Sequence, residues 1–317
     1  MTVSANPILL VGTGYMATEY AKVLKALGRE FVTIGRGQAS AEKFKETTGH
    51  APIPGGIDAW LSTNKALFSK AIVAVSVNEL GKVASSLLHH GFRSILLEKP
   101  GGASTEEIRQ VAAETTETGA HVYLAYNRRF YASTLKAKEI IQEDGGVASF
   151  HFEFTEWSHV VGTQQIAREI LEHWFLCNST HVVDMAFFLG GKPRQMNSYA
   201  AGGLPWHPSA SIFAGAGIAD NGALFSYQAN WEAPGRWGVE VLTRKHRLIF
   251  RPLEELHIQA IGSVAIQKVE IDNALDLQFK PGLYRQVEDF LSSAPTLCTI
   301  EEQADCVSWY NKICPQQ

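Results

Sequence analysis

The chain has 317 residues, which is enough for about two domains and for a core that folds without disulfides or metal ions. Its 28 Lys and Arg face 32 Asp and Glu, so the formal net charge is −4 and a polybasic nucleic-acid or membrane binder is excluded. Seven Trp and sixteen Phe carry too much apolar surface for a disordered chain.

The first 125 residues alternate short apolar runs with helix-like stretches. The runs have the length and residue types of strands buried on both faces and cover 8–11, 31–34, 71–75, 94–97 and 122–125. Helical patterns follow the first run and also cover 79–90 and 105–118. This order predicts an α/β domain over residues 1–125, with a doubly wound parallel sheet of the Rossmann type.

After residue 126 the pattern changes to alternating strands. Apolar and polar residues alternate over 150–155, and similar strands are predicted at 239–243, 247–251 and 264–271. A helix is predicted over 179–189, and two more over 283–293 and 300–313. We expect an α+β domain over residues 126–317 with a mostly antiparallel sheet, whose open face would join copies into a dimer or tetramer.

A glycine turn ends the first strand. Gly12 permits the tight turn, Gly14 lets the backbone approach a pyrophosphate, and Ala17 allows the helix to pack closely. With Thr13, Tyr15 and Met16, these residues predict a dinucleotide site at a helix N-terminus. The alternative is a glycine-rich turn that binds no nucleotide.

The end of the second strand predicts the cofactor. NAD-binding proteins commonly place an acidic residue there, whereas this chain has Gly35 and Arg36, with Ser40 nearby. The guanidinium of Arg36 could pair with a 2′-phosphate, so NADP is favoured over NAD. The alternative is an exposed arginine that contacts no cofactor.

A lysine follows the fourth strand, in the sequence Glu98-Lys99-Pro100. Ligands of open α/β sheets bind at the carboxyl ends of the strands, where Lys99 could donate a proton to a carbonyl oxygen. A cis bond between Lys99 and Pro100 is one conformation open to this segment. Taken alone, Glu98 and Lys99 could also be a solvated charge pair.

These motifs together resemble the Gfo/Idh/MocA oxidoreductases, a family named for glucose–fructose oxidoreductase and inositol dehydrogenase. The resemblance covers nearly the whole chain and rests on the sequences Gly12-Thr13-Gly14-Tyr15-Met16-Ala17, Ser76-Val77-Asn78, Glu98-Lys99-Pro100, Tyr126-Asn127-Arg128-Arg129-Phe130, His181-Val182-Val183-Asp184 and Tyr284-Arg285-Gln286. It implies a two-domain NAD(P)-dependent oxidoreductase acting on sugars, cyclitols or nucleotide-linked sugars. It also implies Lys99 and His181 as catalytic residues. The cofactor residues that it adds are Ser76, Asn78, Glu98, Lys99 and Arg129.

The chain departs from the family pattern beside His181. The family commonly carries an Asp four residues before this histidine and a Gly two residues before it, where this chain has Cys177 and Ser179. A neutral thiol cannot hold a protonated Lys or His as a carboxylate does. Gly81 also stands where the family often has a His.

Several polar and aromatic residues of the second domain are further candidates for substrate contacts. They are Trp157, His173, Cys177, Asn178, Trp231 and Arg236. Each could instead be a core aromatic residue or a polar surface residue.

The cysteines carry no metal or disulfide pattern. Cys177, Cys298, Cys306 and Cys314 form no CxxC pair, so we expect reduced thiols, no metal site and a cytoplasmic protein. The first residues lack the basic charge of a secretory signal, and no apolar run is long enough to span a bilayer.

The sequence therefore predicts an enzyme that transfers a hydride between a nicotinamide and a carbohydrate-like alcohol or ketone. The alternative is a dinucleotide-binding sensor or regulatory protein of the same fold that performs no turnover. Cys177 at the position of the family Asp favours the sensor, whereas Lys99 and His181 favour the enzyme.

Overall fold

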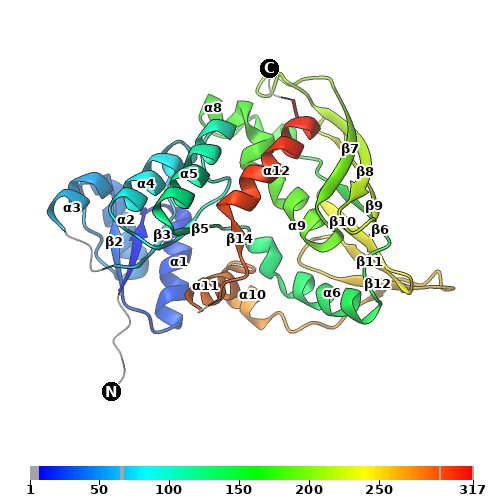
Figure 1. Cartoon of the computed structure of the whole chain (residues 1–317), viewed down its shortest axis with the longest axis horizontal. Helices are drawn as coiled ribbons and strands as arrows, with labels where there is room; N and C mark the ends of the chain where they lie inside the picture. The colour runs from blue at the N-terminus through cyan, green and yellow to red at the C-terminus, as the bar shows by residue number, and fades with distance from the viewer. Residues whose placement is uncertain (1–6, 65–67, 293, 316–317) are drawn as a thin grey trace. The chain divides into compact units, whose positions relative to one another are not determined.

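The computed structural model describes residues 7–64, 68–292 and 294–315, which belong to two compact units (Figure 1). Unit 1 combines the chain up to Tyr126 with the late segment Gln278–Asp305, and unit 2 combines Asn127–Leu277 with the chain from Cys306. The sequence-based division at residue 125 left no late segment in the first domain. Residues 278–305 return to it because the short strand Cys298–Thr299 pairs with the strand His121–Leu124.

Unit 1 is built on a six-stranded sheet with the order β14-β5-β4-β3-β1-β2. The strands are β1 (Ile8–Val11), β2 (Phe31–Ile34), β3 (Lys70–Val73), β4 (Ser94–Leu97), β5 (His121–Leu124) and β14 (Cys298–Thr299). Helices of this unit are α1 (Tyr15–Ala26), α2 (Gln38–Thr48), α3 (Ile57–Thr63), α4 (Val77–His89), α5 (Thr105–Thr118) and α11 (Leu283–Leu291). Strands β1 to β5 are parallel, so the predicted doubly wound sheet is confirmed.

The parallel strands are apolar because helices cover them. All four residues of β1 are buried, and so are the last three of β3, β4 and β5. Such strands read as continuous apolar runs in the sequence. Their carboxyl ends, at Val11, Ile34, Val73 and Leu97, lead into the loops that carry the predicted site residues.

Unit 2 is built on an eight-stranded sheet with the order β13-β12-β11-β10-β6-β9-β8-β7. The strands are β6 (Ser149–Glu153), β7 (Pro193–Ala201), β8 (Ile212–Ala219), β9 (Leu224–Asn230), β10 (Gly238–Leu242), β11 (His246–Phe250), β12 (His257–Ala260) and β13 (Gln267–Lys268). Its other elements are η1 (Asn127–Phe130), α6 (Ala132–Glu143), α7 (Ser158–Val161), α8 (Arg168–Glu172), η2 (Phe175–Ser179) and α9 (Thr180–Gly190); α10 (Ala274–Gln278) and α12 (Ile300–Ile313) cross the unit boundaries. Among the described strands of this sheet, only β6 and β9 pair in parallel, so the mostly antiparallel sheet is confirmed.

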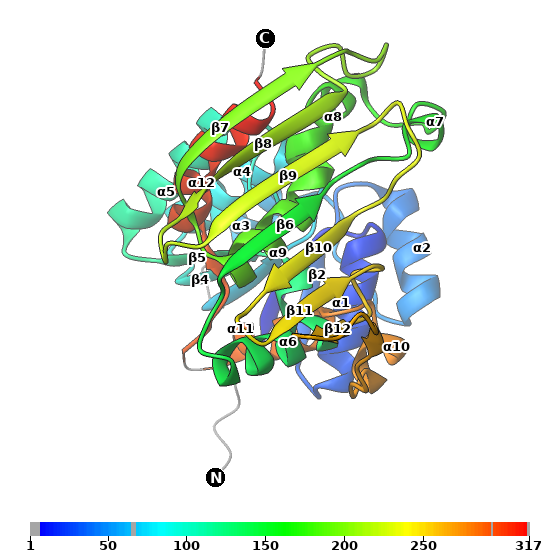
Figure 2. The same cartoon turned by 90° about the vertical axis from the view of Figure 1, so that its right-hand side faces the viewer.

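One face of this sheet packs on α9, and the other is open. Phe150, Phe152 and Phe154 are buried, and the ring of Phe187 on α9 meets those of Phe150 and Phe152 edge to face. Figure 2 shows the opposite face with no described helix of unit 2 across it. Tyr199 of β7 and its partner Ala214 of β8 are exposed on this face, with Tyr199 73 % exposed, as expected for an open antiparallel sheet.

The strand predictions for the second domain were incomplete. Strands β7, β8 and β9 were missed, and β8 contains alternating Ala and Gly residues that have low β-propensity. The strand predicted over 264–271 was wrong: β12 lies earlier, at His257–Ala260, and only Gln267–Lys268 pair within the predicted range. In the part of the chain that the structure describes, we find no helix of the length and apolarity needed to cross a bilayer.

Candidate functional site

The glycine turn joins β1 to α1, and its first glycine, Gly12, could not be replaced by a larger residue. Gly12 has φ of 124°, and a Cβ there would collide with the carbonyl oxygen of Ala74 on the neighbouring strand's exit. Gly14 caps α1, and a Cβ on it would meet nothing within 4 Å, so the space above the helix N-terminus is open. No acidic residue occupies the first turn of α1, which leaves its positive end to a bound anion.

A pocket of about 780 Å³ lies above this turn, within unit 1. Predicted cofactor residues that line it are Gly12, Thr13, Gly14, Tyr15, Met16, Arg36 and Ser76. Ala17 is fully buried beneath the turn, and Asn78 is an exposed residue of α4 outside the lining. The open cradle, the helix end and the missing acid of the first turn fit a dinucleotide pyrophosphate.

The pocket also contains charges that the sequence analysis did not single out. Asp58, Glu79 and Lys82 line it together with Arg36. Nη1 of Arg36 lies 3.3 Å from Oε1 of Glu79, and the arginine side chain is 76 % exposed. Glu79 lies in the first turn of α4, three residues after Ser76, and this place near the end of β3 is the signal that could have revealed it.

The segment after β2, which carries Arg36, is joined to the glycine turn by a polar contact. Thr13 Oγ1 donates to Ser40 Oγ over 2.9 Å, and Ser40 Oγ donates to the carbonyl oxygen of Gly37 over 3.0 Å. A Cβ on Gly35 would lie 2.7 Å from Thr13 Cγ2, which explains a glycine at the end of β2. The loop after β2 is therefore fixed to the glycine turn through Thr13.

Glu98 and Lys99 follow β4 and have different surroundings. Oε1 of Glu98 accepts a hydrogen bond from the Tyr20 hydroxyl over 2.8 Å, below the glycine turn on α1. Burial raises the pKa of Glu98, although the Tyr20 bond and the positive charges of Lys99 and Lys280 lower it in part. Burial, with the charge of Glu98, also raises the pKa of Tyr20 well above its usual value.

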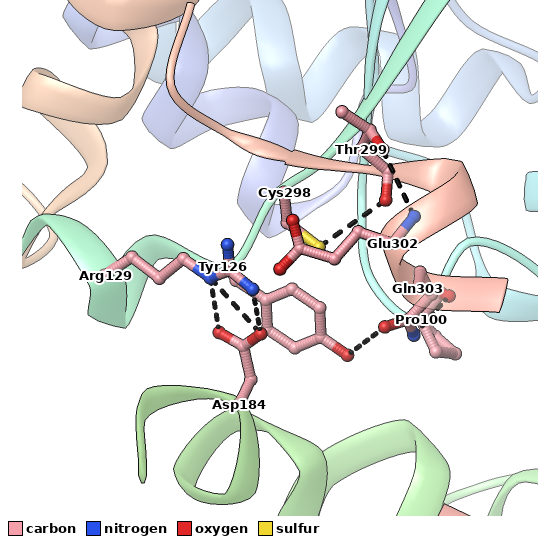
Figure 3. A network of polar contacts seen from close by, with 8 residues as sticks. All are labelled: Pro100, Tyr126, Arg129, Asp184, Cys298, Thr299, Glu302 and Gln303. Atoms are coloured by element: carbon pink, nitrogen blue, oxygen red, sulfur yellow. Dashed lines mark hydrogen bonds and ion pairs between the residues drawn. The ribbon is translucent and has the colours of Figure 1, made fainter. Parts of the chain in front are cut away.

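The peptide bond between Lys99 and Pro100 is cis, and the turn is anchored by the late segment of the chain. Gln303 on α12 donates from Nε2 to the carbonyl oxygen of Pro100 over 3.0 Å, and its Oε1 accepts from the Tyr126 hydroxyl over 3.1 Å (Figure 3). Gln303 is fully buried. The backbone beside Lys99 is therefore held by residues distant in sequence, which no local pattern reveals.

Arg129, predicted as a cofactor residue, forms a buried ion pair within unit 2. Its Nε donates to Asp184 Oδ2 over 2.9 Å and its Nη2 donates to Asp184 Oδ1 over 2.6 Å (Figure 3). The side chains are 6 % and 3 % exposed, so the pair joins η1 to α9 in the core of the unit. A contact of Arg129 with cofactor remains a prediction.

His181 stands in the first turn of α9, directly after a π-helical turn. This turn, η2, contains Cys177, which is buried and whose backbone N–H donates to the carbonyl oxygen of His173. The His181 ring lies 6.3 Å from that of Trp237, and 9 % of the residue is exposed. Single π turns within helices often occur at functional sites, and here the turn covers the departures from the family motif.

Glu156, which the sequence analysis did not select, binds the same turn. Its Oε1 accepts from Ser179 Oγ over 2.7 Å and from Asn178 Nδ2 over 3.0 Å, and Oε2 lies 3.7 Å from Arg236 Nη1. Only 2 % of Glu156 is exposed, and burial raises its pKa more than these partners lower it. A buried carboxylate thus lies beside η2 although position 177 has none.

The two aromatic substrate candidates, Trp157 and Trp231, differ in exposure to solvent. Trp157 is 49 % exposed, and the guanidinium of Arg236 lies 4.7 Å from its ring centroid. The interpretation of Trp231 as a substrate contact is corrected: it is 1 % exposed, donates its N–H to the carbonyl oxygen of Phe154 and stacks on Trp206 in the core. Its aromatic ring and N–H are as suitable for a core position as for a sugar site.

His173 lies at a second cavity of unit 2, of about 350 Å³. Buried His207 and Cys314 also line this cavity, with His207 Nε2 at 3.9 Å from the Cys314 sulfur. Burial raises the pKa of the Cys314 thiol to about 12, and it lowers that of His207. Among the residues placed by the structure, no group of three His, Cys, Asp or Glu could hold a metal ion.

Comparison with known proteins gives the class of the first domain. Residues 7–126 match the family described as "Oxidoreductase family, NAD-binding Rossmann fold", or GFO_IDH_MocA. No curated protein sequence matches the chain significantly. Residues 7–126, with the glycine turn and its pocket, therefore resemble the NAD-binding Rossmann domain of the Gfo/Idh/MocA oxidoreductases.

Solved structures share the fold of both units. A levoglucosan dehydrogenase in complex with NADH and L-sorbose has a TM-score of 0.79 at 16 % identity, covering 97 % of this chain and 95 % of its own. An Agrobacterium radiobacter oxidoreductase in complex with NAD⁺, L-tartaric acid and magnesium scores 0.78 at 12 % identity, with 96 % and 94 % covered. A UDP-N-acetylglucosamine 3-dehydrogenase from Acidithiobacillus ferrooxidans scores 0.72 at 14 % identity, with 97 % and 96 % covered.

Proposed function

We propose that this protein transfers a hydride between a nicotinamide dinucleotide and a carbon of a carbohydrate-like alcohol or ketone. The observation that carries the proposal is the open glycine-turn pocket of about 780 Å³, in a domain of an NAD-binding oxidoreductase family. Structural neighbours that are named for levoglucosan and UDP-N-acetylglucosamine support a sugar, cyclitol or nucleotide-linked sugar as substrate.

The dinucleotide would be held at the end of β1 and would supply the hydride donor or acceptor. Gly12 and Gly14 admit the pyrophosphate to the N-terminal end of α1. Lys99 is the residue that we assign to proton transfer at the substrate oxygen, because a developing alkoxide needs a donor within hydrogen-bond reach. His181 is assigned to holding that oxygen or sharing the proton.

Steady-state kinetics of Lys99→Met and His181→Ala test this assignment. A positioned acid or base is typically worth about 10²–10⁴-fold in rate, so Lys99→Met should lose that much of kcat while nicotinamide fluorescence shows unchanged NADPH binding. His181→Ala should impair both kcat and KM, because it also removes a substrate contact. Near-normal kcat in Lys99→Met would refute the role of this lysine.

We further propose that NADP(H) binds more tightly than NAD(H). The support is the absence of an acid at residues 35–40 and the exposed guanidinium of Arg36 at the pocket. Losing one charge-assisted contact typically costs about 1.5–3 kcal/mol, so Arg36→Ala should weaken NADPH selectively in fluorescence titrations. Tighter binding of NADH by the unmodified protein would overturn this preference.

A second candidate function is a dinucleotide-binding sensor without turnover, which is favoured by Cys177 at the position of the family Asp. A sensor would bind NADPH but would show no substrate-dependent change in nicotinamide absorbance across sugars, ketosugars and nucleotide-sugars. Any such change that Lys99→Met abolishes would favour the enzyme.

The open face of the unit 2 sheet is the surface that we propose for pairing with other copies of this chain. Tyr199 and Leu224 are 73 % and 60 % exposed, and small residues, Ala214, Ala216 and Ser226, share the same face. Light scattering after chromatography should report a dimer or tetramer, and Tyr199→Asp should shift it toward monomer. A monomer at every concentration would refute this pairing.

A further inference from the structure

Two arginines of unit 2 contact one tryptophan ring. The guanidinium carbon of Arg128 lies 5.0 Å from the Trp237 ring centroid, and that of Arg236 lies 4.9 Å from it. Both distances are within the range of cation–π attraction. The His181 ring lies 6.3 Å from the same indole. Two fixed positive charges are therefore gathered beside the histidine that we assign to the substrate.

This cluster contains buried donors that lack acceptors. Arg128 Nε and Trp237 Nε1 are buried and have no hydrogen-bond partner among the residues of the structure. Arg128 Nη1 donates to Asn127 Oδ1 over 3.1 Å, so only part of this guanidinium is used. Buried N–H groups without partners are uncommon, and in a binding site they are explained by an acceptor that arrives with the ligand.

The surrounding carboxylates compensate these charges only in part. Oε1 of Glu156 is engaged by Ser179 and Asn178, and Oε2 lies 3.7 Å from Arg236, beyond hydrogen-bond length. Burial raises the pKa of Glu156, so its negative charge is less stable than that of an exposed acid. Glu254 is exposed and acts on Arg128 through its charge.

Burial also lowers the pKa of Arg128, because the charged guanidinium has lost solvent. An arginine remains protonated at neutral pH, so the lost hydration has to be replaced by partners. Arg236 is close enough to lower the pKa of Arg128 further, as a like charge does. An anion placed between the two guanidiniums would relieve both effects.

We propose that Arg128 and Arg236, on the ring of Trp237, bind an anionic group of the substrate, so that the carbohydrate-like substrate is a carboxylate- or phosphate-bearing sugar. A planar guanidinium binds either group through paired N–H donors. The proposal rests on the proposed function for the identity of the ligand as substrate, whereas the anion site itself depends only on unit 2.

Isothermal titration with matched sugars tests the anion site. D-glucuronate carries a carboxylate, D-glucose 6-phosphate carries a phosphate, and D-glucose is the neutral reference. Each is titrated with and without NADP⁺. We expect one of the two anions to bind at least about tenfold more tightly than D-glucose, because charge-assisted contacts have that magnitude. The sugar that binds more tightly shows whether the site prefers a carboxylate or a phosphate.

Variants connect that affinity to the two arginines. Arg236→Gln should lower the affinity for the preferred anion about tenfold or more and leave that for D-glucose unchanged. Arg128→Lys keeps the charge without the planar fork and should weaken the same anion severalfold. Arg194→Gln removes an exposed arginine of β7 and is the matched control, with no expected effect. Circular dichroism confirms that each variant is folded.

Three results would overturn the site: D-glucose binding as tightly as both anions, neither anion binding, or Arg236→Gln weakening neutral and anionic sugars equally. The proposed function fails separately, when the protein binds no NADP(H) or shows no substrate-dependent absorbance change. In that case, a loss of anion affinity in Arg236→Gln would still support the anion site, in a protein that lacks the proposed activity.

Discussion

The buried ion pair between Arg129 and Asp184 allows a quantitative prediction of stability. Both side chains are at most 6 % exposed, and two N–H groups of the guanidinium bind the two carboxylate oxygens. Asp184→Asn keeps the shape but removes the negative charge that contacts the buried guanidinium of Arg129. Such a change typically costs about 3–5 kcal/mol, which is a large part of the roughly 5–15 kcal/mol that stabilises a typical protein.

Urea denaturation followed by tryptophan fluorescence measures this loss. The double variant Arg129→Met with Asp184→Leu removes both charges and should cost less than Asp184→Asn alone, because neither ion of this pair stays buried after the loss of the other. Glu139→Gln is the matched control, since it breaks the exposed ion pair with Lys136 and should cost far less, because solvent screens such a pair. If Asp184→Asn were no more damaging than Glu139→Gln, the structural role of the buried pair would be refuted.

Three further predictions concern single side chains. Glu79→Gln removes the carboxylate beside Arg36 and should raise the affinity for NADPH relative to NADH severalfold in fluorescence titrations; an unchanged ratio would contradict this. Cys177→Ser should leave turnover nearly intact, because the cysteine is a buried packing residue, and a hundredfold loss of kcat at unchanged stability would show otherwise. Burial lowers the pKa of His207, so the unfolded chain binds the proton more readily than the folded protein. The free energy of unfolding should therefore fall as the pH drops below about 6.5. The urea midpoint should be lower near pH 5.5 than near pH 7.5, and this difference should become smaller in His207→Gln.

The fold of unit 1 could be predicted from the sequence because it depends on patterns among residues that are close together in the chain. Buried parallel strands appear as apolar runs, and the glycine at position 12 is required by its positive φ and by its close approach to Ala74. The second sheet was harder to predict, since β8 uses Ala and Gly where packing against its neighbours decides the structure.

Contacts between site residues that are distant in sequence could not be predicted either. Glu79 and Arg36 are 43 residues apart in sequence, and only the fold places them 3.3 Å from each other. The contact between Glu156 and Ser179 was not predicted, because a position after β6 gives no information about a residue of η2. Trp231 was taken as a substrate candidate because an indole has the same appearance in a sequence whether it is buried or exposed.

The return of residues 278–305 to unit 1 has a consequence for how the protein can be made and divided. Strand β14 closes an edge of the first sheet, and Gln303 holds the Pro100 carbonyl beside Lys99. During synthesis, unit 1 therefore cannot be completed until residues 278–305 have left the ribosome. An excised fragment ending at Tyr126 would expose β5 as a bare edge, and bare edges invite pairing with other chains.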